Sequence, residues 1–137
     1  MNKPYCLTFL TLTFLFTSCI STQRQNSCSS FKEGKFKLNS HVDNATYIIA
    51  RHDSVQTETN IKTKQVTVAK ITWTSDCEYE LLHIIQPTDS INTINKFFES
   101  TPAKVKILKA TKSYYVFEAY ADGVNAKLVD TLWHLKD

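Results

Sequence analysis

Short runs of β-branched and aromatic residues follow one another from residue 34 to the end of the chain, and this pattern restricts the chain to folds made of β-strands. Turn residues separate the runs, and polar and apolar side chains alternate within several of them. Eight strands are expected, at residues 34–38, 45–51, 55–61, 65–74, 77–85, 105–110, 113–121 and 124–135. Asp122-Gly123, between the last two runs, predicts a tight hairpin with a type I′ turn.

One segment departs from the strand period. Between residues 90 and 99, Ile91, Ile94 and Phe98 recur three or four positions apart, which is the spacing of an apolar stripe on a helix. Polar residues precede the segment and Pro102 follows it, as at the two ends of a helix. We expect a short amphipathic helix that covers one end of the sheet.

A closed barrel suits this order of elements, because closing the sheet leaves no exposed edge strand. The expected fold is all-β and mainly antiparallel: a small lipocalin-like meander barrel of eight strands with one short helix near residues 90–100. A flattened β-sandwich is the alternative. The interior of such a barrel is either filled by side chains or holds one small ligand. Bulky candidates for the interior are Trp73, Tyr79, Leu81, Tyr115, Phe117 and Trp133.

The N-terminus has the composition of a secretory signal. A lysine near the start precedes an apolar run at residues 7–16 that is too short to span a bilayer as a helix. Phe16-Thr17-Ser18-Cys19 resembles a bacterial lipobox, which implies that Cys19 becomes the first mature residue and carries palmitate and other lipid. The alternative is simple secretion with Cys19 as a thiol. We expect a signal peptide at 1–18, a lipidated polar tether at 19–30 and one β-rich domain at 31–137.

The four cysteines divide accordingly. Cys6 leaves with the signal peptide and Cys19 is used for lipid, so Cys28 and Cys77 remain as a pair in an oxidising compartment. We predict that these two form a disulfide. No CxxC or HxxxH spacing accompanies them, so no metal site is expected.

Composition excludes several classes of function. Two glycines in 137 residues leave no material for the glycine-rich loops that bind nucleotide phosphates. Fourteen lysines and two arginines, with a net charge of +3, are unlike a nucleic-acid-binding domain, which relies on arginine for bidentate contacts. No serine-hydrolase, zinc-protease or P-loop motif is present. We expect no cofactor and no nucleic-acid partner.

Arg51, Gln56 and Glu58 form the most informative polar cluster in the sequence. If Asp53-Ser54 is a two-residue turn, Arg51 lies opposite Gln56 and diagonal to Glu58 on one face of a hairpin. On an inward face, the three residues would form either a structural hydrogen-bond network or the polar floor of a ligand pocket. They are the candidate ligand-binding residues.

Four motifs together resemble a family of small uncharacterised lipoproteins of Bacteroidetes, including flavobacteria. The motifs are Cys28-x-x-Phe31-Lys32-x-Gly34-Lys35-Phe36, Arg51-x-Asp53-x-x-Gln56-x-Glu58, Trp73-x-x-Asp76-Cys77-x-Tyr79-Glu80-Leu81 and the closing segment 132–137. The resemblance implies an envelope protein. Some members carry the label DNA topoisomerase IV, but such an enzyme requires an ATPase site and a much longer chain than this one. In such lipoproteins acidic residues after the anchor resemble a surface-export tag, and residues 20–24 contain none, which favours a lipid-anchored protein that faces the periplasm.

These observations predict a non-catalytic module of the bacterial envelope. Its partners would be the membrane, through the lipid on Cys19, and a small apolar or amphipathic ligand or an envelope protein. One alternative is a small hydrolase or lyase that uses Glu80 with His83, or Arg51 with Glu58. A purely structural lipoprotein is the other alternative. No residue is assigned a catalytic role.

Overall fold

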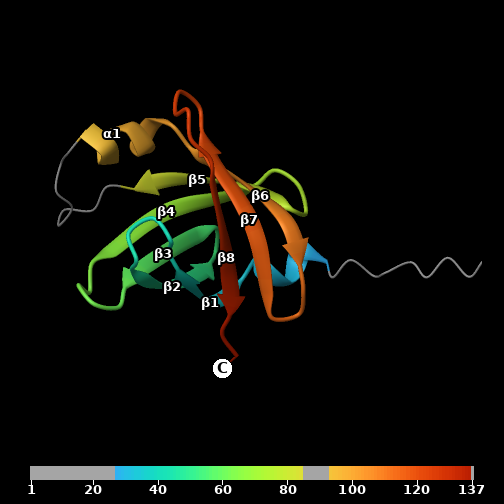
Figure 1. The fold of residues 1–137 in the computed structure, drawn as a ribbon. Coiled ribbons are helices and arrows are strands. Elements are labelled where there is room, and N and C mark those ends of the chain that lie inside the picture. Colours follow the sequence, from blue (N-terminus) through green and yellow to red (C-terminus); the bar gives the residue numbers. More distant parts are fainter. Residues whose placement is uncertain (1–26, 85–92, 137) are drawn as a thin grey trace, which may run out of the picture.

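The computed structural model of the chain describes residues 27–84 and 93–136. They form a closed antiparallel barrel in which each strand pairs with the next and β8 pairs back with β1 (Figure 1). The strands are β1 (Gly34–Asn39), β2 (Thr46–His52), β3 (Val55–Asn60), β4 (Val66–Trp73), β5 (Glu78–Ile84), β6 (Ala103–Ala110), β7 (Tyr114–Ala121) and β8 (Leu128–His134). The expected eight-stranded meander barrel is confirmed, and the alternative sandwich is wrong.

Alternation along the strands builds the core. Phe36 on β1, Tyr115 on β7 and Leu132 on β8 are almost completely buried. Trp133, which was expected to fill the interior, is 44% exposed and stacks on Tyr114 outside the barrel. The reason is the strand period, since the neighbour of an inward-facing residue faces outward. The other five residues expected in the interior belong to the core or pack against it.

A short 3₁₀ helix, η1 (Cys28–Phe31), lies across one end of the barrel. Phe31 is fully buried, with its ring 4.8 Å from that of Tyr115 and 6.1 Å from that of Phe36. The predicted disulfide joins Cys28 to Cys77 at the start of β5. We call this the closed end. The folded body therefore includes residues that the sequence assigned to the tether, whereas residues 1–26, with Cys6 and Cys19, lie outside the described part.

The predicted helix is present as α1 (Thr93–Ser100), which lies against β5 at the other end of the barrel (Figure 1). Its expected beginning, including Ile91, falls outside the described residues. Pro102 follows the helix, as expected, and β6 begins directly after it. In residues 27–84 and 93–136, no helix has the length and apolar character needed to cross a membrane.

The prediction of a type I′ turn at Asp122-Gly123 is wrong. Gly123 alone has a positive φ, of 81°, whereas a type I′ turn requires positive φ at both central residues. β8 then begins only at Leu128, four residues later than expected. Instead, the two-residue turn between β2 and β3 has positive φ at both central residues, 48° at Asp53 and 64° at Ser54.

Candidate ligand-binding site

Arg51 lies inside the barrel, on β2, directly opposite Gln56 of β3. The two residues expose only 3% and 2% of their surface. The two-residue turn between the strands sets this register, so the sequence-based pairing of Arg51 with Gln56 is confirmed. Arg51 Nε donates a hydrogen bond of 2.7 Å to Gln56 Oε1.

Three further groups hold the guanidinium of Arg51. Nη1 donates to the backbone oxygen of Phe31 at 2.8 Å. Nη2 donates to the hydroxyls of Tyr79 and Tyr115 at 2.7 and 2.8 Å, and these two hydroxyls are hydrogen-bonded to each other at 2.9 Å. The guanidinium carbon also lies 4.6 Å from the centre of the Tyr79 ring and 5.2 Å from that of Phe36. Acceptors and aromatic faces from separate parts of the chain therefore fix this cation.

Gln56 connects Arg51 to Glu58. While its Oε1 accepts from Arg51, its Nε2 donates to Glu58 Oε1 at 2.7 Å. The amide thus links the buried cation to a carboxylate through two hydrogen bonds, so the negative charge of Glu58 helps to stabilise Arg51. Glu58 keeps some contact with solvent, although its carboxyl group lies among barrel side chains. The three predicted residues form one hydrogen-bonded series, and Glu58 is its accessible end.

Burial changes the acid–base properties of this cluster. Loss of hydration raises the pKa of Glu58, and the hydrogen bond from Gln56 and the charge of Arg51 oppose that rise. Burial also raises the pKa of Tyr115 well above its ordinary value, with a further contribution from Tyr79. For Arg51, burial lowers the pKa, but the two phenol oxygens outweigh this effect, so the guanidinium stays charged.

A cavity of about 160 Å³ lies in the barrel next to the cluster, and we call it the interior cavity. Its polar lining comes from Arg51, Gln56, Glu58, Tyr79 and Tyr115. The rest of the lining is apolar and includes Leu38, Ile49, Leu81, Phe117, Leu128 and Leu132. An apolar wall with a few convergent polar groups is typical of small-molecule sites.

Two further spaces adjoin the interior cavity on the side of α1. The first, which we call the mouth, measures about 200 Å³ and shares Glu58, Leu81 and Ala103 with the cavity. The second, the apolar groove, measures about 480 Å³, shares Ala103 and Ala119 with the cavity, and shares Phe98 of α1 with the mouth. Ala103 lines all three spaces, so they adjoin one another, and we call the three together the path.

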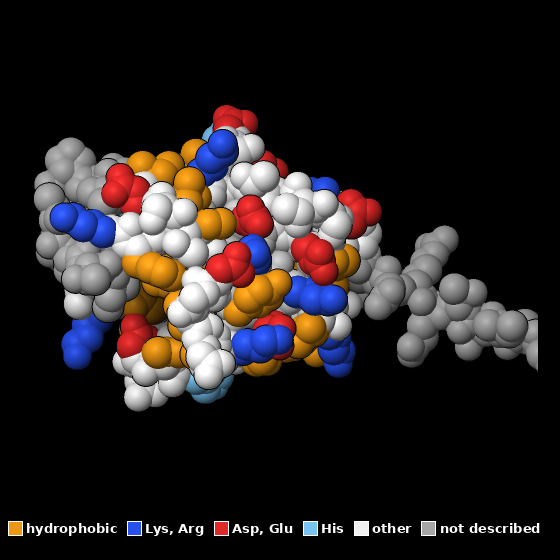
Figure 2. Space-filling model, turned by 90° about the horizontal axis from the view of Figure 1, so that it is seen from above, with side chains coloured by type: hydrophobic (Ala, Val, Ile, Leu, Met, Phe, Trp, Pro, Cys, Tyr) orange, Lys and Arg blue, Asp and Glu red, His pale blue; other side chains and the backbone are white. Residues whose placement is uncertain are grey.

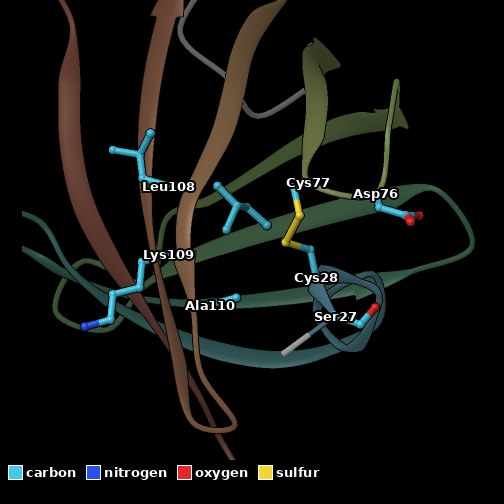
Figure 3. A pocket seen from close by; sticks show the side chains of 8 residues that line it. Ser27, Cys28, Asp76, Cys77, Leu108, Lys109 and Ala110 are labelled. Atoms are coloured by element: carbon cyan, nitrogen blue, oxygen red, sulfur yellow. A yellow bond between two sulfur atoms is a disulfide. The ribbon is translucent and has the colours of Figure 1, made fainter. Parts of the chain in front are cut away.

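A separate pocket of about 210 Å³ lies at the closed end, and the disulfide forms part of its wall (Figure 3). Figure 3 shows Asp76 on one side of the disulfide and Lys109 on the other. The register between β6 and β7 shifts beside it, between Ile107 and Lys109. This pocket shares no lining residue with the interior cavity, so it is not part of the path described above.

The alternative catalytic pair, Glu80 and His83, is not brought together. Glu80 lines a groove on the outside of the barrel with Lys104 and Lys106, whereas His83 lines the mouth. The two are three positions apart on β5, and successive side chains on a strand point to opposite faces. They cannot act on the same atom of a substrate.

The face of the molecule seen in Figure 2 carries charges of both signs. Figure 2 shows acidic, basic and apolar side chains intermixed on the face seen from above. Lys104 pairs with Asp122 at 2.7 Å and Lys127 with Glu118 at 2.8 Å. Within the two described ranges, no group of three or more His, Cys, Asp or Glu side chains is placed to hold a metal ion.

Sequence reasoning missed the chemical roles of Tyr79, Tyr115 and Phe98. It treated both tyrosines as bulky filling, although the shared phase of Tyr79 and Leu81 already placed the Tyr79 hydroxyl on the inner face. The position of Phe98 at the mouth depends on how α1 lies against the barrel, and no local pattern carries that information.

No family model matches the chain, and no curated protein matches it. The function is therefore inferred from the geometry of the site.

Proposed function

We propose that the chain is a lipid-anchored envelope protein whose barrel binds one narrow apolar or amphipathic molecule without changing it chemically. The observation that carries this proposal is the series of three adjoining spaces, the apolar groove, the mouth and the cavity beside Arg51, Gln56 and Glu58. Phe31 and the disulfide close the opposite end, so a ligand would enter beside α1.

The size of the spaces favours a slender ligand. The interior cavity, at about 160 Å³, is smaller than the roughly 300–1,000 Å³ of a drug-sized site. The mouth and the groove extend it with a predominantly apolar lining. A molecule with an unbranched apolar chain could occupy the path along its length and gain from the removal of its surface from water.

A binding role also agrees with how the polar groups are used. Four N–H groups of Arg51 donate to protein acceptors, and both ends of the Gln56 amide are engaged. Neither side chain is available as a base or a nucleophile. Glu80 and His83 are on opposite faces of β5, so they do not support the alternative in which the two act as a catalytic pair.

Binding can be measured with N-phenyl-1-naphthylamine, a neutral apolar dye whose fluorescence rises when it leaves water. The wild-type protein should bind one dye molecule per chain. Ala103→Leu, which adds bulk where the three spaces meet, should weaken binding at least about tenfold, whereas Thr72→Leu, on the exposed face of β4, should leave it unchanged. A wild-type protein that leaves the dye dark would overturn the proposal.

The membrane anchor has its own test. Cells fed radiolabelled palmitate should label the wild-type protein and not Cys19→Ala, with Cys28→Ala as the control that keeps the proposed lipidation site. Equal labelling of wild type and Cys19→Ala would mean that the lipobox resemblance is misleading.

A further inference from the structure

We infer that Glu58 selects the ligand by its head group. The barrel accepts an amphiphile whose head donates a hydrogen bond and carries no negative charge, such as an alcohol or a protonated primary amine, and it rejects a carboxylate. This inference rests on the proposed function, because it specifies the chemistry of the molecule that occupies the same path.

Glu58 is the polar group that a ligand in this path meets. It lines both the interior cavity and the mouth, so it lies where the two spaces join. Its Oε1 accepts the hydrogen bond from Gln56, and in the described part of the chain no hydrogen bond reaches its other oxygen, Oε2. A carboxylate oxygen at such a junction is an acceptor for a ligand donor.

Arg51 does not offer a site for an anion, although it is the cation of the cavity. Its Nε is bonded to Gln56, Nη1 donates to the Phe31 carbonyl, and Nη2 donates to both phenol oxygens. A ligand carboxylate that binds through two N–H groups would have to displace a bond from Nη2, because each two-point face of a guanidinium includes that nitrogen. The fork that elsewhere binds carboxylates is therefore already occupied.

The charges around the junction also disfavour an anionic head. Arg51 is compensated by Glu58 through the Gln56 amide, so a second carboxylate would meet the charge of Glu58 at close range. His83, at the mouth, and Tyr47 are further titratable groups that interact with Glu58. The hydration that Glu58 loses on burial increases the benefit of a donor from the ligand.

Three probes that share a ten-carbon chain separate the effect of the head group from that of the chain. Decan-1-ol, decylamine and decanoic acid are titrated at pH 8 against the disulfide-bonded protein loaded with N-phenyl-1-naphthylamine. For the wild type, the alcohol and the amine should displace the dye, and decanoate should need at least about a tenfold higher concentration.

Glu58→Gln should reverse the preference of the cavity for the head groups of decylamine and decanoate. The new side-chain carbonyl can accept the hydrogen bond from Gln56, which leaves an N–H₂ group facing the cavity. Decanoate should then bind at least about tenfold better than it does to the wild type, and decylamine should bind correspondingly worse. Glu80→Gln, the same substitution on the outer face of β5, should keep the wild-type order of the three probes.

The outcomes distinguish the two proposals. If the dye binds but the wild type is equally displaced by all three probes, the head-group inference is wrong and the binding function stands. If the dye does not bind the wild type, the binding function itself is wrong and the inference fails with it. The wild-type preference needs no substitution, so a misfolded Glu58→Gln variant would not prevent the test.

Discussion

At the scale of single residues, Arg51 shows how a charged group can belong to a barrel core. A guanidinium removed from water loses much hydration energy, and isolated burial would be prohibitive. Here the backbone of Phe31, the amide of Gln56 and the two hydroxyls of Tyr79 and Tyr115 replace that hydration. The same bonds connect η1, β2, β3, β5 and β7, so a single side chain joins distant parts of the sequence.

Arg51→Met should destabilise the protein strongly. The methionine can occupy much of the space, but it leaves buried acceptors and the Glu58 carboxylate without the cation, a loss of roughly 3–5 kcal/mol. Urea unfolding followed by tryptophan fluorescence measures the change in the free energy of unfolding. Lys70→Met, on the exposed face of β4, is the control and should change it by no more than about 0.5 kcal/mol. An equally small effect at Arg51 would show that the network is not needed for stability.

Glu58 should give the stability a dependence on pH. Folding raises its pKa, because burial removes hydration, so the native state holds this proton more tightly than the unfolded state does. The stabilisation from this group is complete below the unfolded pKa of about 4.3 and is lost as the pH rises through the higher native pKa.

Comparison with Glu58→Gln isolates this contribution. Between about pH 4 and pH 7, the free energy of unfolding of the wild type should fall relative to that of the variant, because only the wild type must bury an ionised carboxylate. Urea titrations at several pH values measure the difference, with Glu80→Gln controlling for the loss of one carboxyl group. A difference that stays constant over this range would contradict the assignment.

At the scale of elements, the β2–β3 turn sets the site, because its length decides which residues face each other. Asp53 and Ser54 both adopt left-handed backbone conformations, which cost energy for residues with a Cβ atom. With a turn one residue longer, Arg51 and Gln56 would no longer be paired. The strained backbone of this turn therefore accompanies the strand register that pairs Arg51 with Gln56.

Ser54→Gly should stabilise the protein by about 0.5–1 kcal/mol, because glycine adopts φ near 64° without a steric penalty. Thermal unfolding measures the effect as a rise in melting temperature. Gly123→Ala is the opposite control: a Cβ there meets nothing within 4 Å, so its expected loss of about 1 kcal/mol would come from the backbone conformation at φ 81°. A fall in stability for Ser54→Gly would mean that the serine side chain supports the turn.

At the scale of the whole molecule, the two ends of the barrel differ in chemistry. The closed end has large aromatic side chains, Phe31 and Phe36, and a covalent link from η1 to the start of β5. Small residues, Ala103 and Ala119, line the other end, so space remains between the strands and α1. Under the proposed function, this asymmetry gives a ligand one direction of access.

Removing the disulfide should affect the entire barrel. Cys28 and Cys77 are 49 positions apart, and closing a loop of that length is worth roughly 4 kcal/mol in the chain-entropy treatment of the unfolded state. The double variant Cys28→Ser, Cys77→Ser should lose about 2–5 kcal/mol in urea unfolding. Mass spectrometry without reductant should find the wild type two hydrogens lighter than its reduced form. Two free thiols in the wild type would contradict the link.

Much of the fold could be predicted because local patterns carry it. Alternation identified the strands, the spacing around Phe98 identified α1, and the even number of remaining cysteines identified the disulfide. The start of β8 was misplaced because Val124 and its neighbours have a strand-like composition but lie in the loop that leads to Leu128. Propensity cannot report where pairing with the adjacent strand begins.

The sequence by itself determined that eight strands form and in which segments, where the chain turns between β2 and β3, and that Arg51 and Gln56 pair. These properties depend on neighbours within a few positions, so a period of two and a turn length are sufficient. Only the tertiary structure decided that Tyr79 and Tyr115 accept hydrogen bonds from Arg51 and that Glu58 faces a cavity. Those properties depend on how the sheet closes, which brings together side chains that the sequence separates by dozens of residues.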